Sequence, residues 1–398
     1  VRGESVVWSE VAGPRYTDPE HFRKILHMLR DTLNHNGFRS VTTPAPKPIL
    51  DICDEEGFLV IDESPLYGRP FYKESPRETL IHNTITGIVP GWITAHRNHP
   101  SIVMWSALNE GFLWGASVND RIRIATAIRA FDSTRTIIFD GDGGYTKSLD
   151  WRPDVETIHI HYPEGYEKLL SDSANAIYKS WCATCPLPPG PSTPVKPLGT
   201  GEFLACCWKK ELIPQVYWWQ GLGTRGLRFL QVADIRPYTM RWAWNALHNA
   251  APRQFLSRSM SPVALFDKEY DGLGIGPVYH NRFPEVTSGE SLARTLLLYN
   301  EEFVDSSLTI EVQLTAHGKP LEKIQQRFTV PPGGFVQIPC TLQAPATDAA
   351  SVDLVLTVYK RGIMRFKEAK TFRIRAQQTI RAHDGTKIRL GAPARIAF

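Results

Sequence analysis

The sequence predicts a (β/α)8 TIM barrel followed by an antiparallel β-sandwich, and two patterns along the chain support this. In roughly the first 250 residues, short continuous apolar runs alternate with segments of helical periodicity, which is typical of parallel strands covered by helices. Beyond residue 262 helical signals are nearly absent, and apolar residues alternate with polar ones between turns, as in antiparallel sheets. Eight strand–helix units in about 250 residues favour a closed barrel over an open sheet.

The elements of the barrel follow one another in order. The predicted strands span residues 5–8, 38–42, 58–61, 102–108, 136–139, 157–160, 198–201 and 238–244. The predicted helices span residues 18–36, 47–56, 76–98, 120–131 and 170–181, and a further helical region follows residue 202. The first helix begins at Asp18-Pro19, a capping residue followed by proline, and the second ends at Gly57. No Gly-x-Gly-x-x-Gly motif follows the first strand, which argues against a dinucleotide-binding sheet.

The second part of the chain has the period-two alternation of half-buried strands. Its predicted strands span residues 294–299, 307–314, 325–330, 334–339 and 352–359, with a turn at residues 331–334. We therefore expect three segments: a catalytic barrel over residues 1–252, a β-sandwich over 262–375, and a linker or the start of a further module over 376–398.

Composition and charge narrow the classes of partner. The net charge of +4 comes from scattered Lys and Arg, and no basic run is interleaved with aromatic residues, so we expect no nucleic-acid partner. No apolar run reaches about 18 residues, so we expect no membrane partner. The first residues, Val1-Arg2-Gly3, are not a signal peptide and lack an initiator Met. We expect a processed product or a piece of something larger, and the compartment, cytoplasmic or secreted, stays open.

Four of the six cysteines are close together in sequence. Cys182 and Cys185 form a Cys-x-x-Cys in a Pro-rich loop, and the adjacent pair Cys206-Cys207 follows. A four-thiolate zinc site and a disulfide are alternatives to unrelated thiols, although an adjacent pair is not the usual second half of a zinc site. For the active site we expect no metal and no cofactor.

Two glutamates lie where predicted barrel strands end. Glu110 follows Asn109 directly after the apolar strand 102–108, and Glu202 follows the small residues of Leu198–Gly201. A barrel brings the ends of its strands to one rim. Retaining hydrolysis of a glycosidic bond needs two carboxyl groups about 5–5.5 Å apart, one an acid and one a nucleophile. Either glutamate alone is explained equally well as an ordinary strand-end carboxylate, so the prediction rests on the pair.

Several segments resemble glycoside hydrolase family 2, which includes β-galactosidases, β-glucuronidases and β-mannosidases. Residues 96–110, HRNHPSIVMWSALNE, look like the acid/base signature of that family. Residues 1–3, 36–39 and 50–63 resemble its first strand, its second-strand arginine and its helix–strand unit ending on the third strand. The resemblance covers about residues 1–250 and implies an Ig-like identity for the sandwich.

The resemblance implies a role for each matching residue. Glu110 would be the proton donor and later the base, and Glu202 the nucleophile that forms a glycosyl-enzyme intermediate. Arg39 would help to keep the nucleophile ionised, with a salt bridge inside the barrel as the alternative. Asn109 would bind the 2-hydroxyl of the sugar, and Tyr162 would contact the nucleophile.

The remaining expected contacts with the sugar are Asp62, His161, Trp242 and Asn245. A helix cap is the alternative for Asp62, and a strand-end histidine bonded within the protein is the alternative for His161. Either Trp242 or Trp244 points inward, since alternate residues of a strand face opposite sides.

The expected function is that of a retaining exo-β-glycosidase acting on an oligosaccharide or polysaccharide-derived substrate. β-Galactosides are the first choice of sugar on their frequency in the resembled family alone, with β-glucuronides and β-mannosides behind. The chain has neither the Asn-x-Lys signature of β-glucuronidases nor the His-rich metal segments of large β-galactosidases. The N-terminal β-sandwich domains of the family do not precede the barrel in this sequence. Those domains or a second copy of the chain are therefore expected partners, and a non-catalytic carbohydrate-binding fragment is the alternative function.

Overall fold

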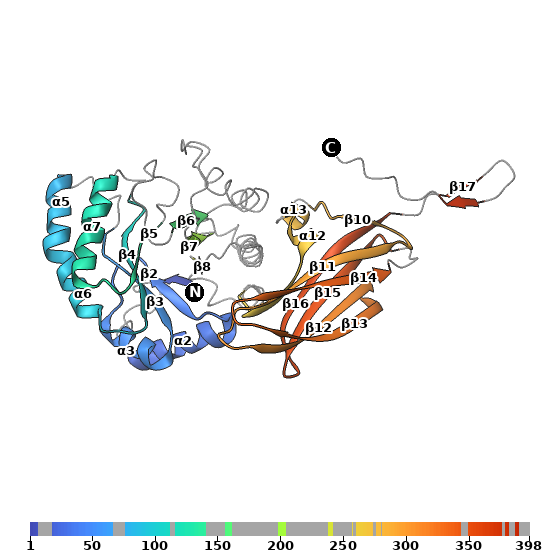
Figure 1. Cartoon of the computed structure of the whole chain (residues 1–398), viewed down its shortest axis with the longest axis horizontal. Helices are drawn as coiled ribbons and strands as arrows, with labels where there is room; N and C mark the ends of the chain where they lie inside the picture. The colour runs from blue at the N-terminus through green and yellow to red at the C-terminus, as the bar shows by residue number, and fades with distance from the viewer. Residues whose placement is uncertain are drawn as a thin grey trace. The chain divides into compact units, whose positions relative to one another are not determined.

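A computed structural model of the chain describes the residues on which the following sections rest. They are residues 1–6, 18–66, 76–111, 116–140, 156–160, 198–203, 238–241, 257, 260–273, 276–279, 281–343, 349–375, 379–381 and 387–389. The chain divides into two compact units, Val1–Met260 and Ser261–Phe398, and each is considered by itself (Figure 1).

Eight parallel strands build the first unit. They are β1 (Arg2–Val6), β2 (Gly37–Ser40), β3 (Leu59–Glu63), β4 (Ile102–Asn109), β5 (Thr136–Asp140), β6 (Glu156–Ile160), β7 (Leu198–Phe203) and β8 (Tyr238–Arg241). Their hydrogen-bonded order is β5-β4-β3-β2-β1-β8-β7-β6. Because β5 also lies beside β6, the sheet closes on itself (Figure 1). The predicted barrel of parallel strands is confirmed.

The bounds of all eight strands differ from the prediction by one to three residues, and three of these strands bear on the site. β1 begins at Arg2 rather than at residue 5, because Arg2 to Glu4 pair with β8. β7 extends to Phe203, so Glu202 lies inside the strand, opposite His159 of β6. β8 is described only to Arg241, and the predicted helix over 170–181 lies outside the described residues.

The described helices of this unit are α2 (Pro19–Leu33), α3 (Lys47–Glu56), α5 (Arg77–Asn83), α6 (Val89–His96) and α7 (Val118–Phe131). A π-helical turn, η2 (Thr84–Ile88), joins α5 to α6, where the sequence predicted one helix. Pro90 explains the interruption, since proline has no N–H and its ring clashes with the carbonyl four residues earlier. The Val89 N–H bonds to the Thr84 carbonyl instead, which is the wider spacing of a π turn.

Successive residues of each strand face opposite sides of the barrel wall. On the outer side, the Phe38 ring lies 6.2 Å from Phe22 and 6.0 Å from Phe58, and these residues belong to the core between sheet and helices. On the inner side, a second apolar cluster contains Ile61 and Ile138. Two residues further along these strands come Glu63 and Asp140, so polar side chains form the layer above this cluster.

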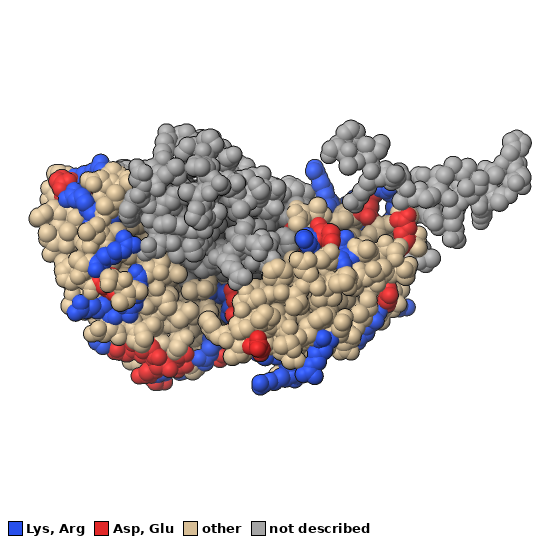
Figure 2. Space-filling view, viewed as in Figure 1, with Lys and Arg blue, Asp and Glu red and all other residues tan. Residues whose placement is uncertain are grey.

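Ion pairs join the outer surfaces of α2 and α3, where acidic side chains gather on the face seen in Figure 2. Arg23 and Arg30 each place a guanidinium nitrogen 3.1 Å from a carboxylate oxygen of Glu56, and Arg23 also pairs with Glu55. Exposed pairs of this kind contribute about 0.2–1 kcal/mol each, so apolar packing provides most of the stability of this helix pair.

The second unit consists mainly of β-strands. They are β9 (Val263–Asp267), β10 (Glu285–Thr287), β11 (Ser291–Asn300), β12 (Ser306–Ala316), β13 (Lys319–Val330), β14 (Phe335–Gln343), β15 (Ser351–Lys360), β16 (Ile363–Arg375), β17 (Thr379–Arg381) and β18 (Lys387–Arg389). Two short helices, α12 (Lys268–Asp271) and α13 (Gly276–Tyr279), follow β9. The sheets have the orders β10-β16-β15-β12-β13, β14-β11-β9 and β17-β18.

Aromatic contacts join the two larger sheets. The Phe266 ring lies 6.4 Å from Phe366, and Tyr270 lies 5.3 Å from Phe372. The sequence analysis missed β9, β10, β16, β17 and β18. β9 is buried along its whole length and shows no alternation, and β10 pairs in parallel with β16, so this sheet is not purely antiparallel.

Two further observations concern the described residues as a whole. No helix among them is both long and apolar enough to span a bilayer. Cys53 and Cys340 are buried free thiols. The four cysteines for which zinc, a disulfide and unrelated thiols were the alternatives lie outside the described residues.

The buried carboxylate of Asp132, which is bonded by Trp105 of β4, provides a test of stability. Hydrogen bonds reach Asp132 from Thr134 (2.6 and 2.8 Å), Trp105 (2.9 Å) and Arg135 (2.5 Å). Burial alone would raise the pKa of Asp132, but these donors lower it from 3.8 to about 2.

Asp132→Asn should therefore lower stability by about 2 kcal/mol at pH 7. Because the folded pKa is depressed, the difference from wild type should shrink as the pH falls from about 4 to about 2. Thermal unfolding at several pH values measures it, with the exposed Asp31→Asn as control, expected to change stability by less than about 0.5 kcal/mol. A difference that stays equal at pH 7 and pH 3 would contradict the assignment.

Candidate active site

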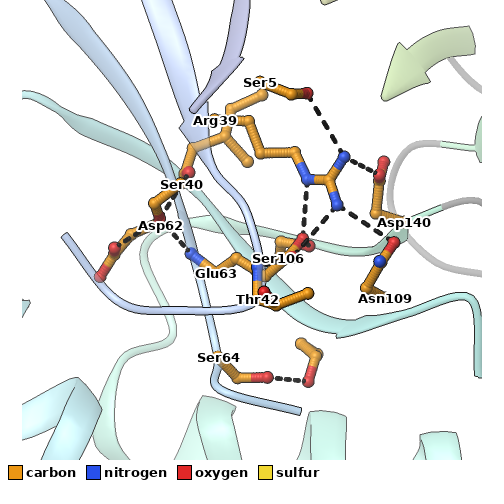
Figure 3. Close-up of polar contacts among 12 residues, drawn as sticks. Ser5, Arg39, Ser40, Thr42, Asp62, Glu63, Ser64, Ser106, Asn109 and Asp140 are labelled. Atoms are coloured by element: carbon orange, nitrogen blue, oxygen red, sulfur yellow. Dashed lines mark hydrogen bonds and ion pairs between the residues drawn. The ribbon is translucent and has the colours of Figure 1, made fainter. Parts of the chain in front are cut away.

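A fully buried arginine lies at the centre of the polar layer inside the barrel (Figure 3). Arg39 of β2 donates to Glu63 Oε2 from Nε at 2.7 Å and to Glu63 Oε1 from Nη2 at 3.1 Å. Nη2 also donates to Asn109 Oδ1 at 3.1 Å. Nη1 lies 2.5 Å from Asp140 Oδ2 and 3.5 Å from Ser5 Oγ. Five neighbouring strands, β1 to β5, thus contribute to one cluster.

The carboxylate of Glu63 accepts further hydrogen bonds from the backbone just after β2 and from a side chain of β4. The Thr42 N–H donates to Oε1 at 2.6 Å, and the Ser106 hydroxyl donates to Oε2 at 2.6 Å. Burial raises the pKa of Glu63, and the Asp140 carboxylate adds to this, whereas Arg39 and Ser106 act in the opposite direction. The Arg39 guanidinium binds the Glu63 carboxylate through two hydrogen bonds, which offsets the free-energy cost of burying this carboxylate.

Asn109 and Glu110 follow each other at the end of β4. The β4–β5 register shifts between Ser106 and Asn109, so that Asn109 lies opposite Asp140. Glu110 has a left-handed backbone, with φ of 51°, which is uncommon for a residue other than glycine. Its N–H donates to the Asp140 carbonyl at 2.7 Å. Asn109 is nearly buried, and Glu110 is partly exposed.

Asp62 lies on the other side of the wall from Glu63, because neighbouring residues of β3 alternate. Its carboxylate is fully buried. Its partners are Ser40 Oγ (3.1 Å), Ala45 N (2.7 Å), Trp92 Nε1 (2.7 Å) and His96 Nδ1 (2.7 Å). This geometry links β3 to the helices and does not support the expected contact of Asp62 with the sugar.

The described backbone has the two predicted glutamate positions at corresponding ends of their strands. Glu110 directly follows β4, and Glu202 is the second-last residue of β7. Both positions are at the carboxyl ends of parallel strands, which meet at one end of a barrel. The other predicted contacts, His161, Tyr162, Trp242 and Asn245, follow β6 and β8 but lie outside the described residues.

The sequence analysis did not include Glu63, Ser106 or Asp140 among the site residues. One signal was available: of the adjacent carboxylates Asp62 and Glu63, only one can face the barrel interior. For Asp140, the signal was its place at the end of the predicted strand 136–139.

Known protein families provide an independent comparison. The model of the family described as "Glycosyl hydrolases family 2, TIM barrel domain" matches residues 13–184. Over these residues the chain matches glycoside hydrolase family 2. This match contains β2 to β5 and therefore the Arg39 cluster of the family 2 barrel, apart from Ser5.

Relatives of this chain include the β-glucuronidase of Mus musculus, which is 28% identical over 169 residues, 40% of this chain and 25% of that protein. The chain spans about a quarter of the length of such curated relatives. Among solved structures, the β-D-mannosidase of Dictyoglomus thermophilum has a TM-score of 0.56 at 13% identity, over 94% of this chain and 50% of that one. The exo-chitosanase of Amycolatopsis orientalis has a TM-score of 0.57 at 10% identity, over 98% and 50%. These structures are similar in fold.

Removing the central guanidinium tests the energetics of the cluster. Arg39→Met leaves the carboxylates of Glu63 and Asp140 buried without their main cation, and should cost about 3–5 kcal/mol of stability. Denaturant unfolding measures this loss. Arg123→Met is the matched control, because it removes an exposed pair with Glu78 and should cost less than about 1 kcal/mol. Equal losses in the two variants would contradict the central role of Arg39.

Proposed function

We propose that this chain is the catalytic barrel of a retaining exo-β-glycosidase that works by double displacement. The observation that carries the proposal is the pair Asn109-Glu110 at the end of β4, with Asn109 held by Arg39 at the rim. The position of Glu202 at the end of β7 supports it. The family match supports the same reaction class.

In the proposed mechanism the two glutamates act in turn. Glu110 gives its proton to the leaving oxygen while the Glu202 carboxylate attacks the anomeric carbon, which forms a glycosyl-enzyme ester. Glu110, now a carboxylate, removes a proton from the incoming water, and that water displaces Glu202. Two inversions at the same carbon give net retention.

Asn109 has the orientation required to bind the sugar. The guanidinium of Arg39 contains only donors, so it selects the carbonyl oxygen of the Asn109 amide. The Nδ2 group therefore points away from Arg39, and no group in the described part of the chain accepts a hydrogen bond from it. We assign this Nδ2 to the 2-hydroxyl of the substrate.

The rest of the proposed site extends the same rim. His161, Tyr162, Trp242 and Asn245 stay in the proposal as contacts of the sugar or the nucleophile, since they follow β6 and β8. Arg39 stays as the buried cation of the site, whereas Asp62 is left out because its carboxylate bonds four protein groups. For the second unit, we propose an Ig-like domain over residues 262–375, supported by its two facing sheets.

For the sugar, the relatives favour a β-glucuronide over the β-galactoside expected from the sequence, because the named relatives are β-glucuronidases. The absence of an Asn-x-Lys signature argues against a β-glucuronide. A panel of p-nitrophenyl β-glucuronide, β-galactoside and β-mannoside decides between them. We expect hydrolysis of one of them, with the initial product in the β configuration by NMR.

The alternative, a carbohydrate-binding barrel without activity, makes a different prediction in the same panel. It predicts binding of glycosides by calorimetry without release of nitrophenol, both for this chain and for a form preceded by the N-terminal domains typical of the family. Release of nitrophenol by either form would contradict the alternative.

A matched pair of variants separates the roles of the two glutamates. Glu202→Ala should lose turnover, and added azide should restore it with an azido-sugar of inverted configuration, because azide replaces the missing nucleophile. Glu110→Ala should lose about 10²–10⁴-fold in rate, and azide should give the retained configuration, since it attacks the glycosyl-enzyme. NMR of the products distinguishes them. Ordinary activity of Glu202→Ala without azide would remove that residue from the mechanism.

A further inference from the structure

Asp140 joins the two parts of the proposed site through two different groups. Its carboxylate Oδ2 lies 2.5 Å from Arg39 Nη1, and its main-chain carbonyl accepts the Glu110 N–H at 2.7 Å. Figure 3 shows Asp140 and Asn109 beside each other at the end of the guanidinium, with Glu63 at its other edge. One residue of β5 therefore contacts both the buried cation and the residue proposed as acid/base.

The main-chain contact stabilises a strained backbone conformation at Glu110. A left-handed backbone is unfavourable for a residue with a Cβ atom, so Glu110 keeps its φ of 51° only if its neighbours hold it there. The Asp140 carbonyl holds the Glu110 N–H, and the Leu66 carbonyl holds the N–H of Asn109 at 3.1 Å. These two bonds define the direction in which the end of β4 leaves the sheet.

The side-chain contact acts on Asn109. Glu63 binds Nε and Nη2 of the Arg39 guanidinium. The partners of the remaining nitrogen, Nη1, therefore limit any further rotation of the guanidinium. The Asp140 carboxylate and the Ser5 hydroxyl are the partners of Nη1 among the described residues that bond Arg39. The carboxylate is the charged and closer of the two, so it contributes most to the angle at which Nη2 reaches Asn109 Oδ1.

We propose that Asp140 is a positioning residue for the glycosidase reaction: it holds Arg39 so that Asn109 presents Nδ2 to the sugar, and it holds the backbone of Glu110. This inference rests on the proposed function for its kinetic part. Its geometric part concerns the contact between Arg39 and Asn109 and does not depend on activity. Burying two carboxylates around one guanidinium costs folding free energy. In this proposal, the arrangement orients Asn109 and Glu110 in return.

The kinetic test uses a double-mutant cycle on the best p-nitrophenyl substrate of the panel. Asp140→Ala should lower kcat by about 100-fold, the scale of a small misplacement of reacting groups, with little change in KM. Asp140→Asn, which keeps an acceptor at the same place, should recover part of the loss. If Asp140 acts through Asn109, the double variant Asp140→Ala/Asn109→Ala should match Asn109→Ala within about twofold. Losses that multiply would overturn the proposal.

The geometric test is a crystal structure of Asp140→Ala, or of Asp140→Leu, which also lacks an acceptor, if the alanine variant does not fold. The expected result is loss of the contact between Arg39 Nη2 and Asn109 Oδ1, and an unchanged contact would overturn the proposal. Asp132→Asn is the control, since it removes a buried carboxylate that does not touch Arg39; it should lower the unfolding temperature and keep kcat within about twofold. A wild type inactive on every glycoside contradicts the proposed function, while the crystal structure still decides the role of Asp140.

Discussion

The buried guanidinium of Arg39 is the constraint on which the rest of the barrel interior depends. A charge without access to water needs close partners of opposite charge and directed hydrogen bonds. Here strands β1, β3, β4 and β5 each provide such a partner for the arginine of β2. A shift of any of these strands by one residue would turn its polar group to the outer core and an apolar side chain toward the cation. The cluster thus ties the strand registers to the polar chemistry of the rim.

Much of this arrangement was accessible from the sequence, and the reasons for the misses are specific. Continuous apolar runs ending in polar residues indicated the barrel, and they located Asn109 and Glu110 at the end of a strand. Arg39 came from the resemblance to the family's second-strand arginine. The choice between Asp62 and Glu63 needed the facing direction of β3, which depends on its pairing with β2 and β4. The contact of Asp140 with Glu110 depends on the irregular register near the end of β4, and local sequence does not reveal such a shift.

The two faces of the wall are not independent. The Ser40 hydroxyl accepts the Glu63 N–H at 2.9 Å and lies 3.1 Å from Asp62 Oδ1. Asp62 in turn bonds Trp92 and His96, one turn apart on α6. The helix that follows the π turn is therefore connected to the inner cluster through one hydroxyl group, and its placement contributes to the geometry around Arg39.

Most residues of the motif over 96–110 form contacts within the protein, whereas its last two residues are those proposed to bind substrate. His96 bonds Asp62, His99 bonds Asp54 at 2.7 Å, and Trp105 packs on Trp92 and bonds Asp132. Under the proposed mechanism only the final two residues, Asn109 and Glu110, contact substrate. Replacement of these two alone would leave nearly all contacts of the motif in place. A family 2 barrel is thus one or two substitutions away from a stable protein that keeps its fold and its family signature but has lost hydrolysis, which is a short evolutionary route to a sugar-binding descendant.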